Sequence, residues 1–396
     1  MAGEVITVYA GQQPPESWVA CIFIGGSAPG LSASGTPWQS EFIALLRDRW
    51  ASEGRLVVFA PGPGSGVRND AGSELIDWYD HAFEIADVVM FWWPEDADLL
   101  LMSANLAAWN DSQRVVHGTP SYLQGRYLLR YGDRHAMSTA TTLAGMANAV
   151  LDKIGPGARR AAGEREVPLP VWRTDSFQRW YSAQTTAGNT LLGARQVWTF
   201  SAGSRKRILV YWALHVRMHV QTEDRVKSNE VVISRPDISV LVLYQRGATI
   251  DDTTIVLVRE FRSPASTPDG FVHELPGGSG PAEDDALDQA VRETEEETGL
   301  AIDVQRIRAH GSRQLAATMS AHHAHLFAAE ITGEELARLR ATRWTPHGAG
   351  GTEQTWTEIT TFGELRGSRL VDWSTLGMIA EAVLDSTAVP PEAAKK

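Results

Sequence analysis

The stretch from Glu274 to Leu300, ELPGGSGPAEDDALDQAVRETEEETGL, constrains this chain most, because it joins a glycine-rich loop to an acidic helix. Pro281 suits a first helical position, and Gly299 suits the left-handed residue just past a helix end. Between them, apolar or small residues recur at helical spacing and predict one buried stripe. The residues of that stripe are Leu287, Ala290, Val291 and Thr294. We therefore predict a helix that opens at Pro281 and ends at Gly299.

Three glutamates, Glu293, Glu296 and Glu297, lie off this stripe. Their i, i+3, i+4 spacing brings the carboxylates together on one turn, where they repel each other unless a cation binds. Carboxylate oxygens suit Mg²⁺, Mn²⁺ or Ca²⁺. Gly277 and Gly278 allow the backbone to approach a metal or a phosphate closely. The spacing alone leaves a solvated acidic helix face as an equal alternative.

The same segment resembles the Nudix box. Gly278, Asp284 and the run from Arg292 to Leu300 fall on the required spacing, with Asp284 in place of the usual Glu and Thr294 in place of an aliphatic residue. Neither departure removes a metal ligand. The resemblance implies an active pyrophosphohydrolase, built as an α/β/α sandwich with a mixed sheet. It further implies a Mg²⁺ (or Mn²⁺) cofactor.

The resemblance also assigns roles to the residues of the box. Its metal ligands would be Glu293, Glu296, Glu297 and the Gly277 carbonyl, with Gly278 beside the substrate. Arg292 would orient one of the glutamates through a bidentate pair. Glu296 and Glu297, with Arg292, are therefore expected to be catalytic.

A second run, Val258-Arg259-Glu260-Phe261-Arg262, followed by Glu274, resembles the ADP-ribose and ADP-sugar pyrophosphatases among Nudix enzymes. Arg259 and Arg262 would then bind phosphate or ribose hydroxyls together with Glu274. A surface ion pair is the alternative for each arginine. In related enzymes a glutamate on a late loop is the general base, which makes Glu353 the candidate here. His322 and His323 are rivals for that role.

The composition excludes several other classes of protein. A net charge of -12 argues against a nucleic-acid partner, although a small anionic nucleotide can still bind through a local basic pocket and a metal. The start of the chain lacks a signal-peptide pattern, and the run VVMFWW is too short to cross a membrane. We therefore expect a cytoplasmic enzyme. The single cysteine, Cys21, is expected in the core.

Residues 1–154 alternate between strand-like and helix-like runs, which predicts a parallel, Rossmann-like sheet covered on both faces. The strand-like runs are Val19–Ile24, Leu56–Ala60, Val88–Trp93 and Val115–Gly118. The helix-like runs are Trp38–Trp50, Glu74–Ala86, Leu99–Trp109 and Ser138–Ile154. Ligands of such sheets bind beyond the carboxyl ends of the strands. The loop Gly25-Gly26-Ser27 is one that would frame the pocket.

The motifs IFIGGS, VVFAPGPG, ADVVMFWWP and VVHGTP, in this order, resemble the nucleoside 2-deoxyribosyltransferase-like family. Enzymes of that family cleave N-glycosidic bonds with a Glu nucleophile. This chain has Asn105 where that Glu is expected, and an amide is a very poor nucleophile. The resemblance thus implies a domain that binds a nucleotide or nucleoside, with Gly26, Ser27 and Asn105 near it, but does not cut it. A structural role, or a glycosidase that uses Glu95, Asp96 or Asp98, is the alternative.

The sequence predicts a deoxyribosyltransferase-like domain over residues 1–154, a linker over 155–169 and a Nudix domain over 170–390. The last includes strand-like runs at Gln196–Phe200, Arg207–Val216 and Glu230–Ile233. The resemblance to ADP-ribose pyrophosphatases implies that these strands support a homodimer. We expect hydrolysis of a nucleoside diphosphate linked to another moiety, with ADP-ribose as the leading substrate. A regulator that binds nucleotides without turnover, and a bifunctional N-glycosidase and pyrophosphatase, are the alternatives.

Overall fold

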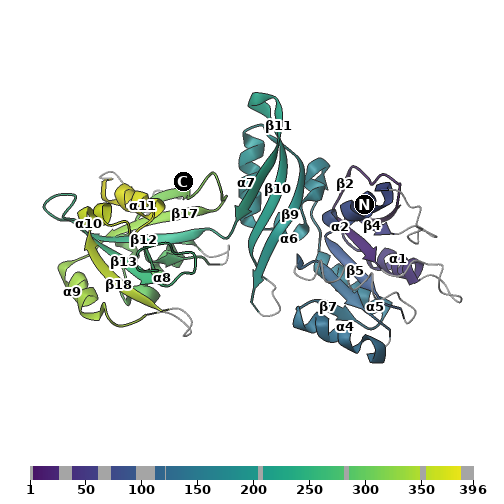
Figure 1. Cartoon of the computed structure of the whole chain (residues 1–396), viewed down its shortest axis with the longest axis horizontal. Coiled ribbons are helices and arrows are strands. Elements are labelled where there is room, and N and C mark those ends of the chain that lie inside the picture. Colours follow the sequence, from purple (N-terminus) through teal and green to yellow (C-terminus); the bar gives the residue numbers. More distant parts are fainter. Residues whose placement is uncertain are drawn as a thin grey trace. The chain divides into compact units, whose positions relative to one another are not determined.

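The computed structural model describes residues 3–25, 38–60, 73–94, 112–120, 122–203, 208–280, 285–347 and 354–384. Contacts within the chain divide it into two units, Met1–Ser234 and Arg235–Lys396. The boundary differs from the predicted one at residues 155–169. The strands between residues 190 and 234 therefore belong to the first unit and not to the second. Figure 1 shows the elements of both units.

A parallel sheet forms the centre of the first unit, as the alternation of strands and helices predicts. Its strands lie in the order β1-β4-β3-β5-β6-β7, and each neighbouring pair is parallel. Their bounds are β1 Glu4–Tyr9, β3 Ala20–Gly25, β4 Arg55–Ala60, β5 Val88–Trp92, β6 Val115–Gly118 and β7 Ser138–Ala140. Strand β4 lies on one side of β3, whereas β5 and the strands after it lie on the other side. The strand order therefore reverses between β3 and β5. Ligands of open α/β sheets bind at such a reversal.

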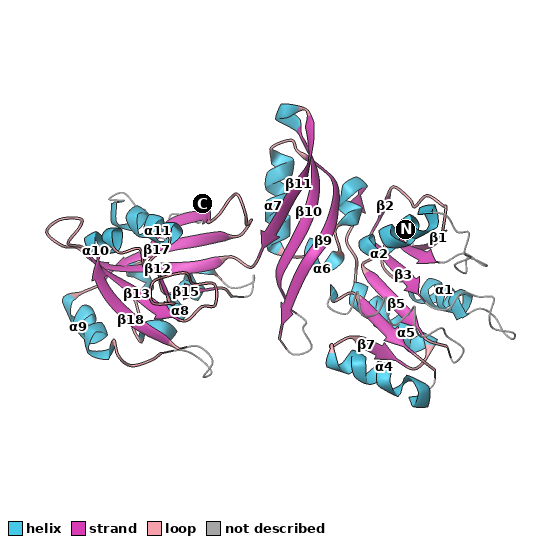
Figure 2. Ribbon diagram, viewed as in Figure 1, coloured by secondary structure: helices cyan, strands magenta, loops and turns pink. Residues whose placement is uncertain are grey.

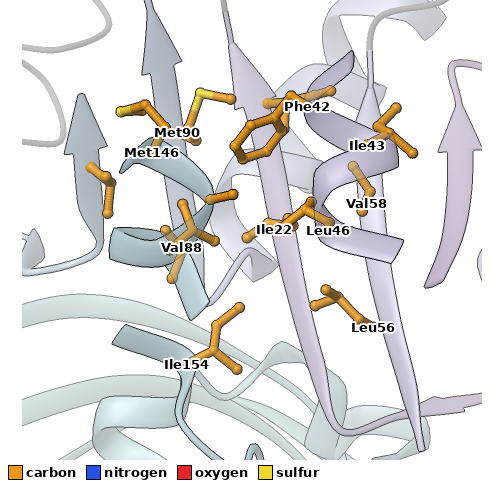
Figure 3. Packing of buried hydrophobic residues seen from close by; sticks show 14 of the residues in the cluster. Ile22, Phe42, Ile43, Leu46, Leu56, Val58, Val88, Met90, Met146 and Ile154 are labelled. Carbon is orange, nitrogen blue, oxygen red and sulfur yellow. The ribbon is translucent and has the colours of Figure 1, made fainter. Parts of the chain in front are cut away.

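Helices cover both faces of this sheet (Figure 2). They are α1 Trp38–Arg49, α2 Ser73–Ile85, α4 Tyr122–Arg134 and α5 Leu143–Ile154. On one face, Phe42 and Leu46 of α1 and Met146 of α5 pack against Ile22 and Val88 (Figure 3). On the other face, α2 packs against the aromatic side chains of β3, β4 and β5. The strands are buried on both faces, which explains their nearly unbroken apolar sequences.

Two local predictions for this unit need correction. The run Ser138–Ile154 is not one helix, because Ser138–Ala140 joins the sheet as β7 and the helix begins only at Leu143, capped by Thr142. Strand β1 and helix α4 are additions that the sequence reading missed. The predicted helix Leu99–Trp109 lies outside the described residues. Cys21 is buried in the core, as predicted.

Residues 155–169 are not a linker. Arg160 is fully buried and pairs with the buried carboxylate of Asp87, to which its Nη1 donates at 2.8 Å. Asp87 also accepts hydrogen bonds from the backbone N–H groups of Cys21 (2.8 Å) and Leu169 (2.9 Å). A buried charge needs such partners. The segment is therefore packed onto the sheet, in the strand β8 (Arg160–Ala161), which pairs with β2 (Ser17–Trp18), and the turn η2 (Ala162–Glu166).

An antiparallel sheet in the order β11-β10-β9 completes the first unit. Its elements are α6 Leu169–Trp172, α7 Asp175–Thr186, β9 Thr190–Ala202, β10 Ile208–Val220, η4 Gln221–Glu223 and β11 Arg225–Ser234. One face packs on α6 and α7 through residues such as Phe177 and Trp212. The other face carries Trp198, Phe200 and Tyr211, whose rings lie 6.1–6.3 Å apart. Trp198 and Phe200 remain about half exposed.

The second unit is a mixed sheet between helices, as predicted. The strands run in the order β14-β13-β12-β17-β16, with β15 on β12 and β18 on β13; β12 and β17 are parallel and the other pairs antiparallel. The strands are β12 Ile238–Gln245, β13 Thr254–Glu260, β14 Val272–Glu274, β15 Gly277–Gly278, β16 Arg308–Gln314, β17 His323–Glu330 and β18 Thr355–Thr361. The helices are α8 Ala286–Thr298, η5 Val304–Arg306, α9 Gly333–Thr342, α10 Phe362–Gly367 and α11 Trp373–Leu384.

Helices α8 and α11 lie on opposite faces of this sheet (Figure 1). Ala290 of α8 packs with Leu241 and Phe327, whereas Ile379 of α11 packs with Val240 and Leu326. Because side chains alternate along a strand, these contacts fix the face to which every strand residue points. Among the described residues, no helix is long and apolar enough to cross a lipid bilayer.

Candidate active site

Helix α8 is formed by clear start and stop signals. The Asp285 carboxylate caps its start by accepting a hydrogen bond from the Leu287 N–H at 2.9 Å. Gly299 ends it in the left-handed conformation, with φ 70°, and donates its N–H to the Glu295 carbonyl at 2.9 Å. The predicted C-terminus is thus confirmed. The helix starts at Ala286, later than predicted, and Pro281 and Asp284 lie outside the described residues.

The predicted stripe of α8 faces the sheet. Ala290 and Thr294 are buried, and Leu287 and Val291 pack against the same cluster while partly exposed. The Thr294 hydroxyl, which replaces an aliphatic group on this stripe, donates to the Ala290 carbonyl at 2.7 Å. Its polar group is therefore satisfied within the helix, and the substitution leaves the packing intact.

Gly277 and Gly278 form β15, which pairs with β12 beside α8. A Cβ atom at Gly277 would lie 2.3 Å from the Ser239 carbonyl oxygen, and one at Gly278 would lie 2.7 Å from the Glu293 carboxyl carbon. Both distances are shorter than any non-bonded contact allows. Glycine is required here because β12 and the Glu293 carboxylate approach the loop from either side.

Glu297 reaches the same loop and accepts a hydrogen bond from the Gly277 N–H at 2.9 Å. Its burial raises the pKa of Glu297 to about 8; the Gly277 hydrogen bond opposes the rise, and the charges of Glu274, Glu293 and Glu260 add to it. Glu296, in contrast, is exposed. The structure thus gathers Glu293 and Glu297 at Gly277–Gly278, with Glu296 on the adjoining solvent side of α8.

Two more carboxylates face α8 from the strands. Glu260 is 4% exposed, and its carboxylate lies 2.8 Å from the guanidinium of Arg262, which is also 3.9 Å from Glu274. Burial raises the pKa of Glu274; Arg262 opposes this rise and Glu260 adds to it. Arg262 and Glu274 therefore lie together near Glu297, as the sequence predicts. Glu260 is a member of the cluster that the sequence reading missed.

Arg292 is linked to Glu293 through the side chain of Gln289. Its guanidinium donates to the side-chain oxygen of Gln289, and the Gln289 amide donates to a Glu293 carboxylate oxygen. Gln289, in the middle of this chain of contacts, is buried with 4% exposed. The predicted orienting role of Arg292 is compatible with this geometry, but the sequence reading overlooked Gln289.

Arg259 does not join this cluster. Its side chain lies on the opposite face of β13, where its guanidinium is 3.0 Å from the Asp269 carboxylate and 3.6 Å from the centre of the Phe271 ring. Glu260, one residue further on, points to the α8 face because side chains of a strand alternate. The structure thus separates Arg259 from Arg262, which the sequence reading had grouped.

The candidates for a general base are placed only in part. Glu353 lies outside the described residues; of the residues on either side, His347 and Thr355 pair through two backbone hydrogen bonds of 2.9 Å. The Thr355 hydroxyl also approaches the Glu297 carbonyl at 3.4 Å. His322 contacts the Ser320 hydroxyl at 2.5 Å, and its burial lowers its pKa. The His323 N–H donates to Asp237 at 2.9 Å.

The candidates in the first unit, Gly26, Ser27 and Asn105, lie outside the described residues. Two buried side chains flank these stretches: Gln39, in the first turn of α1, and Trp93, just after β5. Within the described part of the chain, the side-chain N–H groups of both have no hydrogen-bond partner.

The donor atoms at Gly277–Gly278 fit a divalent cation in their chemistry. Among the described side chains, no three carboxylates or imidazoles come close enough together to share one metal ion. The glycines nevertheless let the Glu293 carboxylate approach the loop closely, and burial, together with the charges of Glu274, Glu293 and Glu260, raises the pKa of Glu297. Oxygen ligands of this kind are those that Mg²⁺ prefers.

Comparison with known proteins agrees with this geometry. Residues 234–357 match the family model described as the NUDIX domain, which spans β12 to the first half of β18. No curated protein matches the chain. Nudix hydrolases act on small molecules and generally use divalent metals. The second unit therefore contains a Nudix domain, and such a domain indicates a Nudix pyrophosphohydrolase.

Proposed function

We propose that the second unit hydrolyses a nucleoside diphosphate linked to another moiety, with ADP-ribose as the first substrate to test. One observation carries the proposal: within the matched NUDIX segment, the carboxylates of α8 meet the Gly277–Gly278 loop, where Glu297 accepts the Gly277 N–H at 2.9 Å. The run that ends in Arg262 supports a substrate of the ADP-ribose type, since its guanidinium lies in the same cluster.

Glu293, Glu296, Glu297 and the Gly277 carbonyl would hold Mg²⁺, which when bound would neutralise the phosphate oxygens and acidify the attacking water. The side chains around them have separate tasks. Arg292 keeps the Glu293 carboxylate in place through Gln289. Arg262, which lies between Glu260 and Glu274, would bind a phosphate or ribose hydroxyl on this face.

Proton removal from the water needs a base, and Glu353 remains our candidate. The flanks of its segment, His347 and Thr355, pair beside the C-terminal end of α8. Burial lowers the pKa of His322, which contacts Ser320, and its role as a rival base stays a prediction.

For the first unit we propose binding of a nucleotide or nucleoside without cleavage. The support is the reversal of strand order between β3 and β5 and, on either side of it, the buried N–H donors of Gln39 and Trp93 that lack partners within the described residues. Asn105 stands where the resembling family has its nucleophile. Calorimetric titration of adenosine and AMP into the wild type and Gln39→Leu tests this, since a bound base or sugar would satisfy that amide.

We further propose that two copies associate through the apolar face of β9 and β10. Trp198 and Phe200 are half exposed there, and Ile208 is 65% exposed. Apolar patches of this kind mark interaction surfaces. Light scattering should report a dimer for the wild type and a monomer for Trp198→Ser with Phe200→Ser; an unchanged dimer would contradict the proposed surface.

Product analysis tests the proposed reaction. Incubation of the protein with ADP-ribose and Mg²⁺ should give AMP and ribose 5-phosphate. If ADP-ribose and other nucleotide sugars bind but none is turned over, the protein is a binding regulator. If free base appears, the first unit cleaves the glycosidic bond and the interpretation of Asn105 is wrong.

A further inference from the structure

A second group of polar side chains lies beside the Gly277–Gly278 loop, at the starts of β12 and β17. Ser239 of β12 pairs with Gly278 on one side and with His325 of β17 on the other. The three residues therefore form one row across the sheet. Neighbouring strands are about 4.8 Å apart, so the backbone of His325 lies roughly 10 Å from that of Gly278.

The side chain of His325 points to the α8 face. Phe327, two residues later, packs in the cluster that contains Ala290 of α8, whereas Leu326 packs on the α11 face. Strand side chains alternate, so His325 shares the face of Phe327. It is thus on the same side of the sheet as Glu293 and Glu297.

Asp237 holds the imidazole of His325 in place. One oxygen of this carboxylate lies 3.3 Å from Nε2 of His325, and the other accepts the His323 N–H at 2.9 Å. The Asp237 side chain is 11% exposed, while that of His325 is 32% exposed. A carboxylate at Nε2 favours the tautomer with its hydrogen there, which leaves Nδ1 as the nitrogen that can accept a hydrogen bond.

The loop after Gly278 is anchored at the same end of the sheet. Arg235, just before β12, donates to the Ser279 hydroxyl at 3.1 Å. The positive charge of the same guanidinium also opposes the rise in the pKa of Glu274. The row of Gly278, Ser239 and His325 is therefore a continuation of the carboxylate cluster and not a separate surface.

We propose that His325 binds the moiety that the substrate carries beyond its diphosphate, and that Asp237 is the positioning residue for this contact. The inference rests on the proposed hydrolysis. A separation of about 10 Å between backbones places His325 past a diphosphate held at Gly278. An imidazole nitrogen that accepts a hydrogen bond selects a hydroxylated group such as a sugar.

Two substrates and one matched control test this assignment in the full-length protein. ADP-ribose and the methyl ester of ADP contain the same diphosphate, but only the first has a sugar beyond it. His325→Ala should raise KM for ADP-ribose about tenfold, with kcat within about twofold, and leave KM for the methyl ester unchanged. Asp237→Asn should shift KM in the same direction by less. His219→Ala removes a comparable histidine, 3.1 Å from Asp224 in the first unit, and should change neither constant.

Three results would overturn the assignment: an equal rise in KM for both substrates, a fall in kcat at constant KM, or no change. If the wild type hydrolyses neither compound, the proposed hydrolysis fails by itself. Calorimetric affinities of the same two compounds for the wild type and His325→Ala then decide the inference. A loss of affinity confined to ADP-ribose supports it, and equal affinities, or no binding of either compound, contradict it.

Discussion

Glu297 is the residue on which the proposed chemistry depends most. Helical spacing brings it beside Glu293, and the fold brings both to Gly277, where burial raises the pKa of Glu297 to about 8. A divalent cation at this point would favour the ionised carboxylate, because opposite charge lowers a carboxyl pKa. Metal binding and the ionisation of Glu297 are therefore expected to be coupled.

Glu297→Gln should lower kcat/KM for ADP-ribose with Mg²⁺ by more than about 100-fold, since losing even an outer partner of a metal ligand typically costs 10–100-fold. Glu295→Gln is the matched control, because Glu295 is exposed on the same helix. Its activity should stay near that of the wild type. Equal losses in the two variants would mean that helix charge matters and Glu297 does not bind the metal.

The sequence predicted part of this site for a clear reason. Spacing within one helix and one loop is visible in the sequence, so the proximity of Gly277 and Gly278 to the glutamates of α8 could be predicted. Glu260 and His325 come from other strands and Asp237 directly precedes one, so their positions depend on sheet register. The separation of Arg259 from Arg262 was available in principle, because alternation along β13 places Arg259 and Glu260 on opposite faces.

The ion pair between Glu335 and Arg306 in the second unit can be tested by lowering the pH. The Glu335 side chain is buried, with 7% exposed, and its carboxylate accepts two hydrogen bonds from Arg306, of 2.6 and 2.8 Å. This contact lowers the pKa of Glu335 from 4.5 to about 2. A lowered pKa stabilises the fold above about pH 4.5, and the stabilisation is lost as the pH falls towards 2.

Glu335→Gln should therefore lower the free energy of unfolding by about 2–3 kcal/mol at pH 7, and the gap to the wild type should narrow below pH 4.5. Urea denaturation at several pH values measures both. Glu334→Gln, at an exposed position of the same helix, is the control. A gap that stays constant with pH would mean that the charge of Glu335 contributes nothing.

At the scale of elements, strands and buried helices were predictable and charged connections were not. The seven strand-like runs that the sequence analysis names lie within observed strands or overlap them, because their apolar content leaves few alternatives. Residues 155–169 looked like a linker because Gly, Ala and charges dominate them. Composition cannot distinguish a solvated arginine from Arg160, which is buried against Asp87.

Removal of that partner should be costly. Asp87→Ala leaves the Arg160 charge buried and unpaired, which should lower the free energy of unfolding of the first unit by about 3–5 kcal/mol. Chemical denaturation followed by the many tryptophans of the chain measures this. Asp152→Ala, an exposed change on α5, should cost less than about 0.5 kcal/mol. A similarly small loss of unfolding free energy in both variants would show that the Asp87–Arg160 pair does not hold residues 155–169 on the sheet.

At the scale of the whole molecule, the boundary between the units falls at Ser234 and Arg235. The sequence reading placed β9, β10 and β11 with the Nudix domain, because strands just before a mixed sheet suggest continuity. In the structure they pack with Phe177 and Val167 of the preceding segments. Helix α7 packs against this sheet through Phe177, and this contact assigns the three strands to the first unit. No local sequence pattern reveals it.

Fragments divided at this boundary should fold separately. Residues 1–234 and 235–396 should each show a cooperative thermal transition, because each retains its own cores. A fragment that begins at residue 170 loses Val167 and the η2 turn beneath β9, and should aggregate or melt at a lower temperature than residues 235–396. A broad, non-cooperative melt of 235–396 would contradict the boundary.

Hydrolysis of the diphosphate bond is the central claim, and water labelled with ¹⁸O tests it most directly. With ADP-ribose, Mg²⁺ and the wild type, mass spectrometry should find one labelled oxygen in the phosphate of AMP or of ribose 5-phosphate, with no free adenine, and Glu297→Gln should give almost none of either product. Released adenine with label on the anomeric hydroxyl of the ribose, or no product from any nucleotide sugar, would contradict the claim.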